Sequence, residues 1–216
     1  MNSFKGQQYR WAKGSAQTTK KLMWTVLRAP LPLKVKIECM FHLTNNFAYL
    51  FLVLLAMLQL PNMVMRQKMN TPALLLLDVP LFLTTCVSIV IFYLATHKAL
   101  YGSLREAIPR LPLMMAVSIG LSINNARAVL EGLFGGESEF VRTPKHNIQG
   151  RGDGWITKKY KASSGLGTYL ELGFGLYIVA TALLAVLTGA WVSIPFLVLF
   201  MVGFLYVGAL SLHQAR

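Results

Sequence analysis

The feature that most constrains this chain is a long stretch without charge. Between Glu38 and Arg66 the sequence contains no Lys, Arg, Asp or Glu, and residues 41–60 are mostly Leu, Phe, Val and Ala. Twenty such residues rise about 30 Å as an α-helix, which matches the thickness of a bilayer core. We therefore predict that this segment crosses a membrane as a helix.

Composition and three further apolar segments extend this prediction to the whole chain. Of the 216 residues, 55% are hydrophobic and only 13% are charged, whereas a soluble domain is usually about one quarter charged. Further apolar segments cover residues 73–96, 169–188 and 191–210. The predicted fold class is an all-α membrane protein with four transmembrane helices. They form a helix pair over residues 41–96 and a helical hairpin over residues 169–216.

The apolar run over residues 111–123 is shorter, and a charge argument decides its placement. Runs of this length are more often interfacial or re-entrant than spanning. If it lies at the interface, 19 of the Lys and Arg residues fall on the side of the two termini and 2 on the opposite side. Because basic residues concentrate on the cytoplasmic side, we predict four spans with both termini in the cytoplasm. Residues 97–134 are then interfacial helices, and residues 135–168 form a cytoplasmic loop of the gating type.

Residues 1–40 form the predicted cytoplasmic and interfacial segment. Residues 17–28 combine apolar and basic side chains at helical spacing, which is typical of an amphipathic helix on a membrane surface. Pro30 and Pro32 are expected to end this helix. The formal charge of +13 then faces anionic lipid. We expect no nucleic-acid partner, because the basic residues interleave with the spans and do not form one patch.

Polar and small side chains in or beside the predicted spans are expected to serve packing. Asn45 and Asn46 are interpreted as interhelical hydrogen-bonding residues, with the lining of a polar path as the alternative. Asp78 lies near the start of its span, where it can reach the interface or pair with a neighbour; a functional role is the alternative. Cys39 and Cys86 lack the spacing of a zinc site or a disulfide framework. Four glycines of the last two spans are expected to allow close helix approach: Gly173, Gly175, Gly203 and Gly208.

A polar motif, Gln7-Gln8-Tyr9-Arg10-Trp11, precedes the first span. A guanidinium can grip a diphosphate with a planar fork of donors. An indole offers a flat apolar face to a sugar ring and one N–H donor to a hydroxyl. The motif therefore indicates a site for a sugar or a sugar diphosphate. The alternative is a basic juxtamembrane anchor with an interfacial Trp.

This motif resembles the Q-x-x-R-W motif of the processive family-2 glycosyltransferases, the group of cellulose, mannan and hyaluronan synthases. A later segment resembles the F-x-V-T-x-K gating-loop motif of cellulose synthases. Phe140, Thr143 and Lys145 occupy its Phe, Thr and Lys positions, and Arg142 replaces its Val. The order is also similar: Q-x-x-R-W, two spans, an interfacial helix, the gating loop and two spans. The resemblance covers nearly the whole chain.

The resemblance implies that this chain is part of an enzyme that transfers sugar from a nucleotide-sugar to a growing β-glycan, with inversion. Such an enzyme passes its product through a channel. By position, Trp11 would stack under the acceptor sugar. Gln7 and Arg10 would contact the acceptor end or the donor diphosphate. The three gating-loop positions would close over the bound nucleotide and exclude water that would hydrolyse the donor.

The catalytic groups of that family are absent from this sequence. The family's D-x-D metal motif and acidic base precede Q-x-x-R-W, whereas the only Asp residues here are Asp78 and Asp153, which cannot form a carboxylate pair for a metal. The resemblance implies the C-terminal membrane half of such an enzyme, inactive alone and binding no cofactor itself. Mg²⁺ or Mn²⁺ is expected in a missing or separate catalytic domain.

Expected partners are that catalytic domain, the nucleotide-sugar, the glycan acceptor and membrane lipid, and the expected location is a bacterial inner membrane. The missing carboxylates favour the alternative, a non-enzymatic four-helix transporter subunit or scaffold.

Overall fold

A computed structural model describes the backbone of residues 1–69, 73–135 and 165–215, and their side chains except at positions 66, 69 and 73–86. Every regular element in these parts of the chain is helical, which confirms the predicted all-α class. The α-helices are α1 (Asn2–Arg28), α2 (Leu33–Thr44), α3 (Ala48–Met69), α4 (Ala73–Tyr101), α5 (Leu111–Gly120), α6 (Ser122–Phe134), α7 (Leu166–Leu187) and α8 (Ile194–His213). Three short 3₁₀ helices are η1 (Asn45–Phe47), η2 (Ile108–Arg110) and η3 (Trp191–Ser193).

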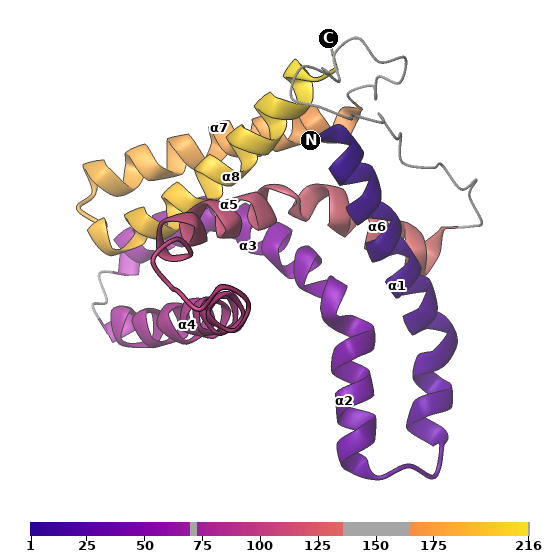
Figure 1. The fold of residues 1–216 in the computed structure, drawn as a ribbon. Coiled ribbons are helices and arrows are strands. Elements are labelled where there is room, and N and C mark those ends of the chain that lie inside the picture. Colours follow the sequence, from indigo (N-terminus) through magenta and orange to yellow (C-terminus); the bar gives the residue numbers. More distant parts are fainter. Residues whose placement is uncertain (70–72, 136–164, 216) are drawn as a thin grey trace.

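Helices α7 and α8 form an antiparallel hairpin, as predicted for residues 169–216 (Figure 1). The turn between them contains Gly189 with a φ of 71°, a left-handed conformation that glycine adopts without strain. Helix α8 packs against α5 as well as α7, and α3 packs against α6 and α7. The predicted hairpin is thus confirmed, and its first helix begins at Leu166.

Three candidate membrane spans are long and apolar enough in the described parts of the chain: Leu33–Met65, Leu166–Leu187 and Trp191–His213. A fourth is counted if α5 and α6, which meet at a bend of 42°, form one broken span and not a re-entrant loop. These helices indicate an integral membrane protein. The predicted second span falls within α4, of which Val87–Tyr101 appears only as a shorter apolar helix. The count of four spans therefore stays a prediction.

The first candidate span contains a break that the sequence did not predict. Its 33 residues would rise about 50 Å as a helix, more than a bilayer core needs. The break is η1, where the Asn46 side-chain amide donates to the Asn45 side-chain oxygen at 2.8 Å. The interpretation of these two residues as interhelical hydrogen-bonding partners is therefore wrong, because they bond to each other at a joint between α2 and α3.

Helix α1 is much longer than the amphipathic helix predicted over residues 17–28. It begins at Asn2 and includes the whole Q-x-x-R-W motif, and it ends at Arg28, before the two prolines as predicted. Helices α1 and α2 form a hairpin that crosses the direction of α7 and α8 (Figure 1). Lys36 Nζ donates to the Leu27 carbonyl oxygen at 2.8 Å across this hairpin.

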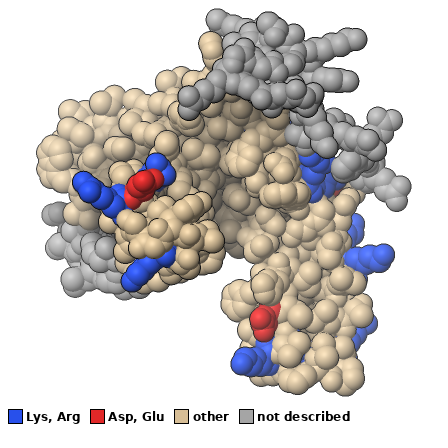
Figure 2. All heavy atoms as spheres, viewed as in Figure 1, with Lys and Arg blue, Asp and Glu red and all other residues tan. Residues whose placement is uncertain are grey.

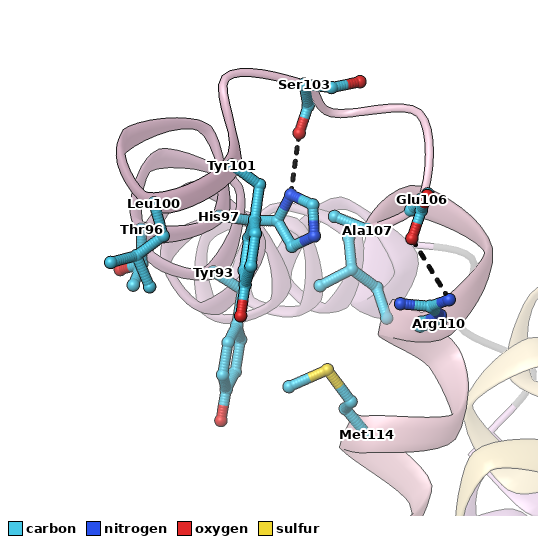
Figure 3. Close-up of a pocket in the computed structure, with 11 residues that line it drawn as sticks. Tyr93, Thr96, His97, Leu100, Tyr101, Ser103, Glu106, Ala107, Arg110 and Met114 are labelled. Atoms are coloured by element: carbon cyan, nitrogen blue, oxygen red, sulfur yellow. Dashed lines mark hydrogen bonds and ion pairs between the residues drawn. The ribbon is translucent and has the colours of Figure 1, made fainter.

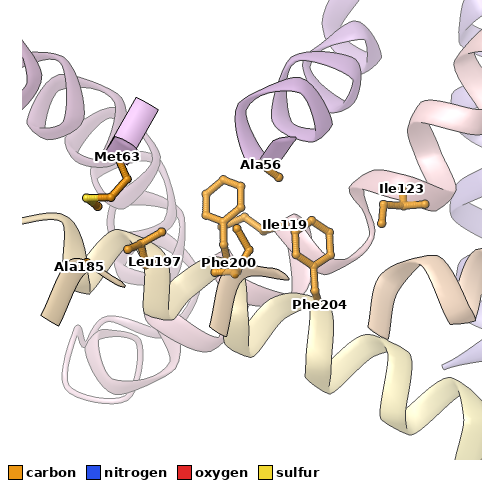
Figure 4. Close-up of a cluster of buried hydrophobic side chains, with 9 residues drawn as sticks. Ala56, Met63, Ile119, Ile123, Ala185, Leu197, Phe200 and Phe204 are labelled. Atoms are coloured by element: carbon orange, nitrogen blue, oxygen red, sulfur yellow. The ribbon is translucent and has the colours of Figure 1, made fainter. Parts of the chain in front are cut away.

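The apolar core lies where α3, α5, α6, α7 and α8 meet (Figure 4). Its largest members, Phe200 and Phe204, are almost fully buried on α8 and pack against Ile119 and Ile123. On the face shown in Figure 2, charged side chains are sparse over this block of helices. They gather on the α1–α2 hairpin and at the corner between α4 and α5. This distribution fits an apolar block in lipid with charged segments outside it.

Glycines bring the core helices into backbone contact. A Cβ atom at Gly203 would lie 2.2 Å from the Ala116 carbonyl oxygen, and one at Gly120 would lie 2.2 Å from the Gly203 carbonyl oxygen. Gly175 and Gly208 similarly face side chains across the α7–α8 hairpin. The prediction of close approach is confirmed for these glycines, although Gly203 faces α5 instead of α7. It is wrong for Gly173, where a Cβ atom would meet no neighbouring group within 4 Å.

Candidate functional site

Helix α1 carries the motif and has two distinct faces. Gln7, Arg10 and Trp11 are spaced i, i+3, i+4 and therefore share one side of the helix. We call this side the motif face. Trp11 is 61% exposed there, and Gln7 and Arg10 are partly exposed. The opposite side packs against neighbouring helices through residues spaced three or four apart: Lys5, Tyr9, Ala12, Ala16 and Thr19.

A buried ion pair fixes the beginning of α1. Lys5 Nζ lies 2.7 Å from Oε1 and 2.8 Å from Oε2 of Glu171 on α7; the Oε2 contact has hydrogen-bond geometry and the Oε1 contact is an ion pair. Nζ also donates to the Thr168 hydroxyl at 3.5 Å and to the Ser211 hydroxyl at 3.4 Å. The Glu171 side chain is fully buried and that of Lys5 is 11% exposed. These four residues, the Lys5 cluster, join α1 to both helices of the hairpin.

The two chain ends lie beside this cluster. The Met1 ammonium donates to the Gln214 side-chain oxygen, and the Asn2 amide donates to the Ser211 carbonyl oxygen at 3.0 Å. The beginning of α1 is thus bonded to the end of α8. Both described ends of the chain lie at the same end of the α7–α8 hairpin (Figure 1).

A second polar cluster joins α1 to α6. Glu131 accepts a hydrogen bond from the Tyr9 hydroxyl and one from Arg127 Nε at 2.7 Å, and Lys13 Nζ lies 3.7 Å from its Oε2. Burial raises the pKa of Tyr9 to about 12, helped by the hydrogen bond to Glu131 and the charge of that carboxylate. Tyr9 is therefore a neutral donor at physiological pH. We call Tyr9, Lys13, Arg127 and Glu131 the Glu131 cluster.

Polar side chains continue from the Lys5 cluster along the beginning of α6. The Asn124 amide donates to the Lys5 carbonyl oxygen at 3.0 Å and to the Asn125 side-chain oxygen at 2.9 Å. The Asn125 amide nitrogen and the Ser122 hydroxyl are fully buried and have no hydrogen-bond partner among the described residues. Buried polar groups are nearly always paired, so this part of the interior is unusually polar for a helix junction.

The second predicted motif lies outside the described residues, so the placement of Phe140, Thr143 and Lys145 stays a prediction. The described chain stops after Gly135 and resumes at Gly165. The helices on either side, α6 and α7, both contact α1 through the two polar clusters. The described helix before this gap and the described helix after it therefore both contact the helix that carries Q-x-x-R-W.

An open groove of about 630 Å³ lies at the corner between α4 and α5 (Figure 3). Three aromatic side chains on α4 line it: Tyr93, His97 and Tyr101. His97 Nδ1 lies 2.7 Å from the Ser103 carbonyl oxygen, and the His97 and Tyr101 ring centres are 4.7 Å apart. Gln7, Arg10 and Trp11 do not line this groove, and we place the candidate site on α1, where these three motif residues lie.

Within the described ranges, no group of three or more His, Cys, Asp or Glu side chains is placed to hold a metal ion. Comparison of the chain with models of protein families, with curated proteins and with solved structures finds no match. The residues of this chain therefore carry the functional inference alone.

Sequence reasoning missed the residues that hold α1 in place. The sequence pattern marks Glu171 only as an acid at the mouth of a span, and it does not single out Lys5 or Glu131. Two signals could have found them. A carboxylate within an apolar segment requires a cationic or hydrogen-bonding partner. The spacing of Lys5, Tyr9, Ala12 and Ala16 also marks a packed helix face.

Proposed function

We propose that this chain is the acceptor-binding, gating and translocation part of a membrane enzyme that transfers sugar from a nucleotide-sugar to a growing β-glycan. The observation that carries the proposal is the motif face of α1. It gathers Gln7, Arg10 and a 61% exposed Trp11 on the side away from the packing contacts. On this face an aromatic surface that can stack on a sugar ring lies beside a guanidinium and an amide that can bond to its polar groups.

Each motif residue suits one part of the substrate. The Trp11 indole provides a flat face for the acceptor ring and an N–H donor for a hydroxyl. The Arg10 guanidinium provides paired donors for a diphosphate. The Gln7 amide both donates and accepts, as sugar hydroxyls require. None of these groups is a general base, so proton transfer and metal binding are assigned to a catalytic domain that this chain does not supply.

The gating role is proposed for Phe140, Thr143 and Lys145 on the resemblance of their spacing. A Lys near a leaving diphosphate would stabilise the charge that develops there. The apolar helices provide the membrane part, and we propose that the end of the structure bearing α1 and both chain ends faces the cytoplasm. Nucleotide-sugars are then supplied on the side of the motif face.

Two exposed tryptophans on one helix give a direct test. Trp11 is 61% exposed in the motif, and Trp24 is 67% exposed near the end of α1, where it lies 5.9 Å from the Arg28 guanidinium. Membranes containing this chain, together with any D-x-D domain that its neighbouring gene region encodes, are given labelled UDP-glucose or GDP-mannose, and polymer is measured. Trp11→Ala should lower synthesis at least about tenfold through loss of stacking, and Trp24→Ala should leave it nearly unchanged.

The outcomes separate the two functional classes. Equal effects of both substitutions would make Trp11 a membrane anchor and contradict the proposed acceptor role. A neighbouring gene region without any D-x-D domain, together with no polymer from either donor, would favour the non-enzymatic transporter subunit or scaffold.

A further inference from the structure

We infer that Lys5 and Glu171 are a positioning pair, whose ion pair sets where the motif face of α1 lies relative to α7 and α8. Its effect on sugar transfer rests on the proposed function, whereas its effect on the position of α1 does not. Neither residue belongs to the Q-x-x-R-W motif. Lys5 precedes Gln7 by less than one helical turn, and Glu171 lies in the second turn of α7.

The surroundings of Lys5 assign it to positioning and not to substrate binding. An ammonium group has three donors, and three acceptors surround this one: Glu171, Thr168 and Ser211. The side chain is 11% exposed, and its partner is fully buried. Lys5 also points to the side of α1 opposite the motif face. A diphosphate bound at Arg10 is therefore outside its bonding direction.

Stability alone does not explain a buried ion pair here. Well-packed apolar side chains of similar volume are often as stabilising as a buried ion pair. A buried charged pair is instead favourable in only one arrangement of the two helices, because a shifted or rotated helix would leave both charges buried and unpaired. The packed face of α1 meets α6 through the small residues Ala12 and Ala16 and through the Glu131 cluster. None of these contacts reaches α7, so we assign the placement of α1 relative to α7 to the ion pair.

A distance measurement tests the geometric part directly in the whole chain. Spin labels are attached at Lys20→Cys on α1 and His213→Cys on α8, both exposed positions, after Cys39→Ser and Cys86→Ser. In lipid nanodiscs the wild-type pair should give one narrow distance distribution. Lys5→Met should broaden or shift it, and the exchange Lys5→Glu with Glu171→Lys should restore it. An unchanged distribution in Lys5→Met would overturn the inference.

A matched control comes from an exposed ion pair of the same chain. Arg110 Nη2 lies 3.3 Å from Glu106 Oε2, and both side chains are about two-thirds exposed, at 66% and 70%. Like Lys5→Met, Arg110→Met removes the cation of an ion pair. It should leave the distance between the labels unchanged.

Activity tests the functional part in the complete synthase. Because a misplacement of about 1 Å can lower a rate about 100-fold, Lys5→Met and Glu171→Gln should lower kcat by about 10- to 100-fold. The KM for the nucleotide-sugar should change less than about twofold, since Lys5 does not touch the donor. The charge exchange should recover kcat. Wild-type kcat in the single variants would overturn the inference and leave the proposed function intact.

Two further outcomes are distinct. If the wild-type protein makes no polymer, the proposed function fails, while the distance measurement still decides the positioning role. If Lys5→Met does not fold, Lys5→Met with Glu171→Leu replaces both charges by apolar groups. This double variant should fold, with a broadened label distance and a lowered kcat; a narrow wild-type distance there would overturn the inference.

Discussion

Two helix contacts in this molecule are built in opposite ways. Helices α5 and α8 cross in backbone contact, with Gly120 and Gly203 so close that a Cβ atom on either would lie 2.2 Å from a carbonyl oxygen. Helix α1 reaches α7 and α8 through the Lys5–Glu171 ion pair, at 2.7 and 2.8 Å. One contact depends on the absence of side chains, and the other depends on two particular side chains.

The difference follows from the surroundings of each contact. Between apolar helices in lipid there is little hydrophobic driving force, so close packing of small residues supplies the attraction. At the end of the hairpin the contact includes charged groups, which must pair when buried. The glycine contact fixes the distance between the axes of α5 and α8, and it depends on the size of the residues there and not on their polarity. The ion pair fixes which residues face each other, which suits a helix that must present a motif.

The largest expected effect comes from breaking the ion pair on one side. Lys5→Met leaves the Glu171 carboxyl fully buried beside an apolar group, so we expect the free energy of unfolding to fall by about 3–5 kcal/mol. Unfolding of purified protein by SDS in mixed micelles, followed by circular dichroism, measures this change. The double variant Lys5→Met with Glu171→Leu should regain most of the loss. A double variant as unstable as the single one would show that the pair itself stabilises the fold.

The next effect tests the glycine contact. Gly203→Ala adds one methyl group that must displace the Ala116 carbonyl oxygen, so we expect a loss of about 1–3 kcal/mol in the same SDS titration. The matched control is Gly173→Ala on α7, where a Cβ atom meets nothing within 4 Å. This control should be neutral or gain up to about 1 kcal/mol, because alanine favours a helix over glycine. Equal losses in both variants would contradict the close crossing of α5 and α8.

A smaller effect is expected in the Glu131 cluster. Tyr9→Phe removes the hydroxyl that donates to Glu131 and should lower the free energy of unfolding by about 1 kcal/mol. Arg127 and Lys13 still pair with that carboxylate in the variant, so the loss stays well below that of Lys5→Met. A loss as large as that of Lys5→Met would show that the two clusters do not differ in the way proposed.

The same cluster has a defined pH dependence. The pKa of Tyr9 rises from 10.0 to about 12, mainly because of burial and then because of the bond to Glu131. Since the folded value is the higher one, the stabilisation by the neutral phenol is complete below about pH 10 and is lost as the pH approaches about 12. Absorbance at 295 nm should show a late-titrating component that Tyr9→Phe removes. A difference spectrum with a midpoint near the ordinary value would contradict the burial of this hydroxyl.

The features that could be predicted from the sequence are those that depend on neighbouring residues along the chain. Apolar length gave the α7–α8 hairpin, and Pro30 and Pro32 gave the end of α1, because each is a local property of the chain. The start of α1 was missed because residues 1–16 are stabilised by packing against α6, α7 and α8 and not by an amphipathic pattern facing lipid. Gln7, Arg10 and Trp11 were selected by their motif, and their role stays a prediction. Their common side follows from the extension of α1 back to Asn2.

Which residues of distant segments pair with each other could not be predicted from the sequence. Lys5 and Glu171 are separated by 166 positions, and the chain offers 21 Lys and Arg residues, so a partner for Glu171 could not be selected. The direction of Gly203 toward α5 depends in the same way on three-dimensional packing. For Gly173, Gly175, Gly203 and Gly208, sequence alone predicted small-residue contacts but not which helix each glycine would meet.

The smallest expected effect comes from an exposed ion pair, which contributes little to the free energy of unfolding. Glu106 and Arg110 are four residues apart and exposed, with 3.3 Å between the paired atoms, so water and salt screen their attraction. Glu106→Gln should change the free energy of unfolding by less than about 0.5 kcal/mol, measured in the SDS titration used for Lys5→Met. Comparing these two variants contrasts a buried ion pair that has additional hydrogen bonds with an exposed pair. If Glu106→Gln were as destabilising as Lys5→Met, burial would not explain the strength of the Lys5 cluster, and the contrast with the glycine contact would lose its basis.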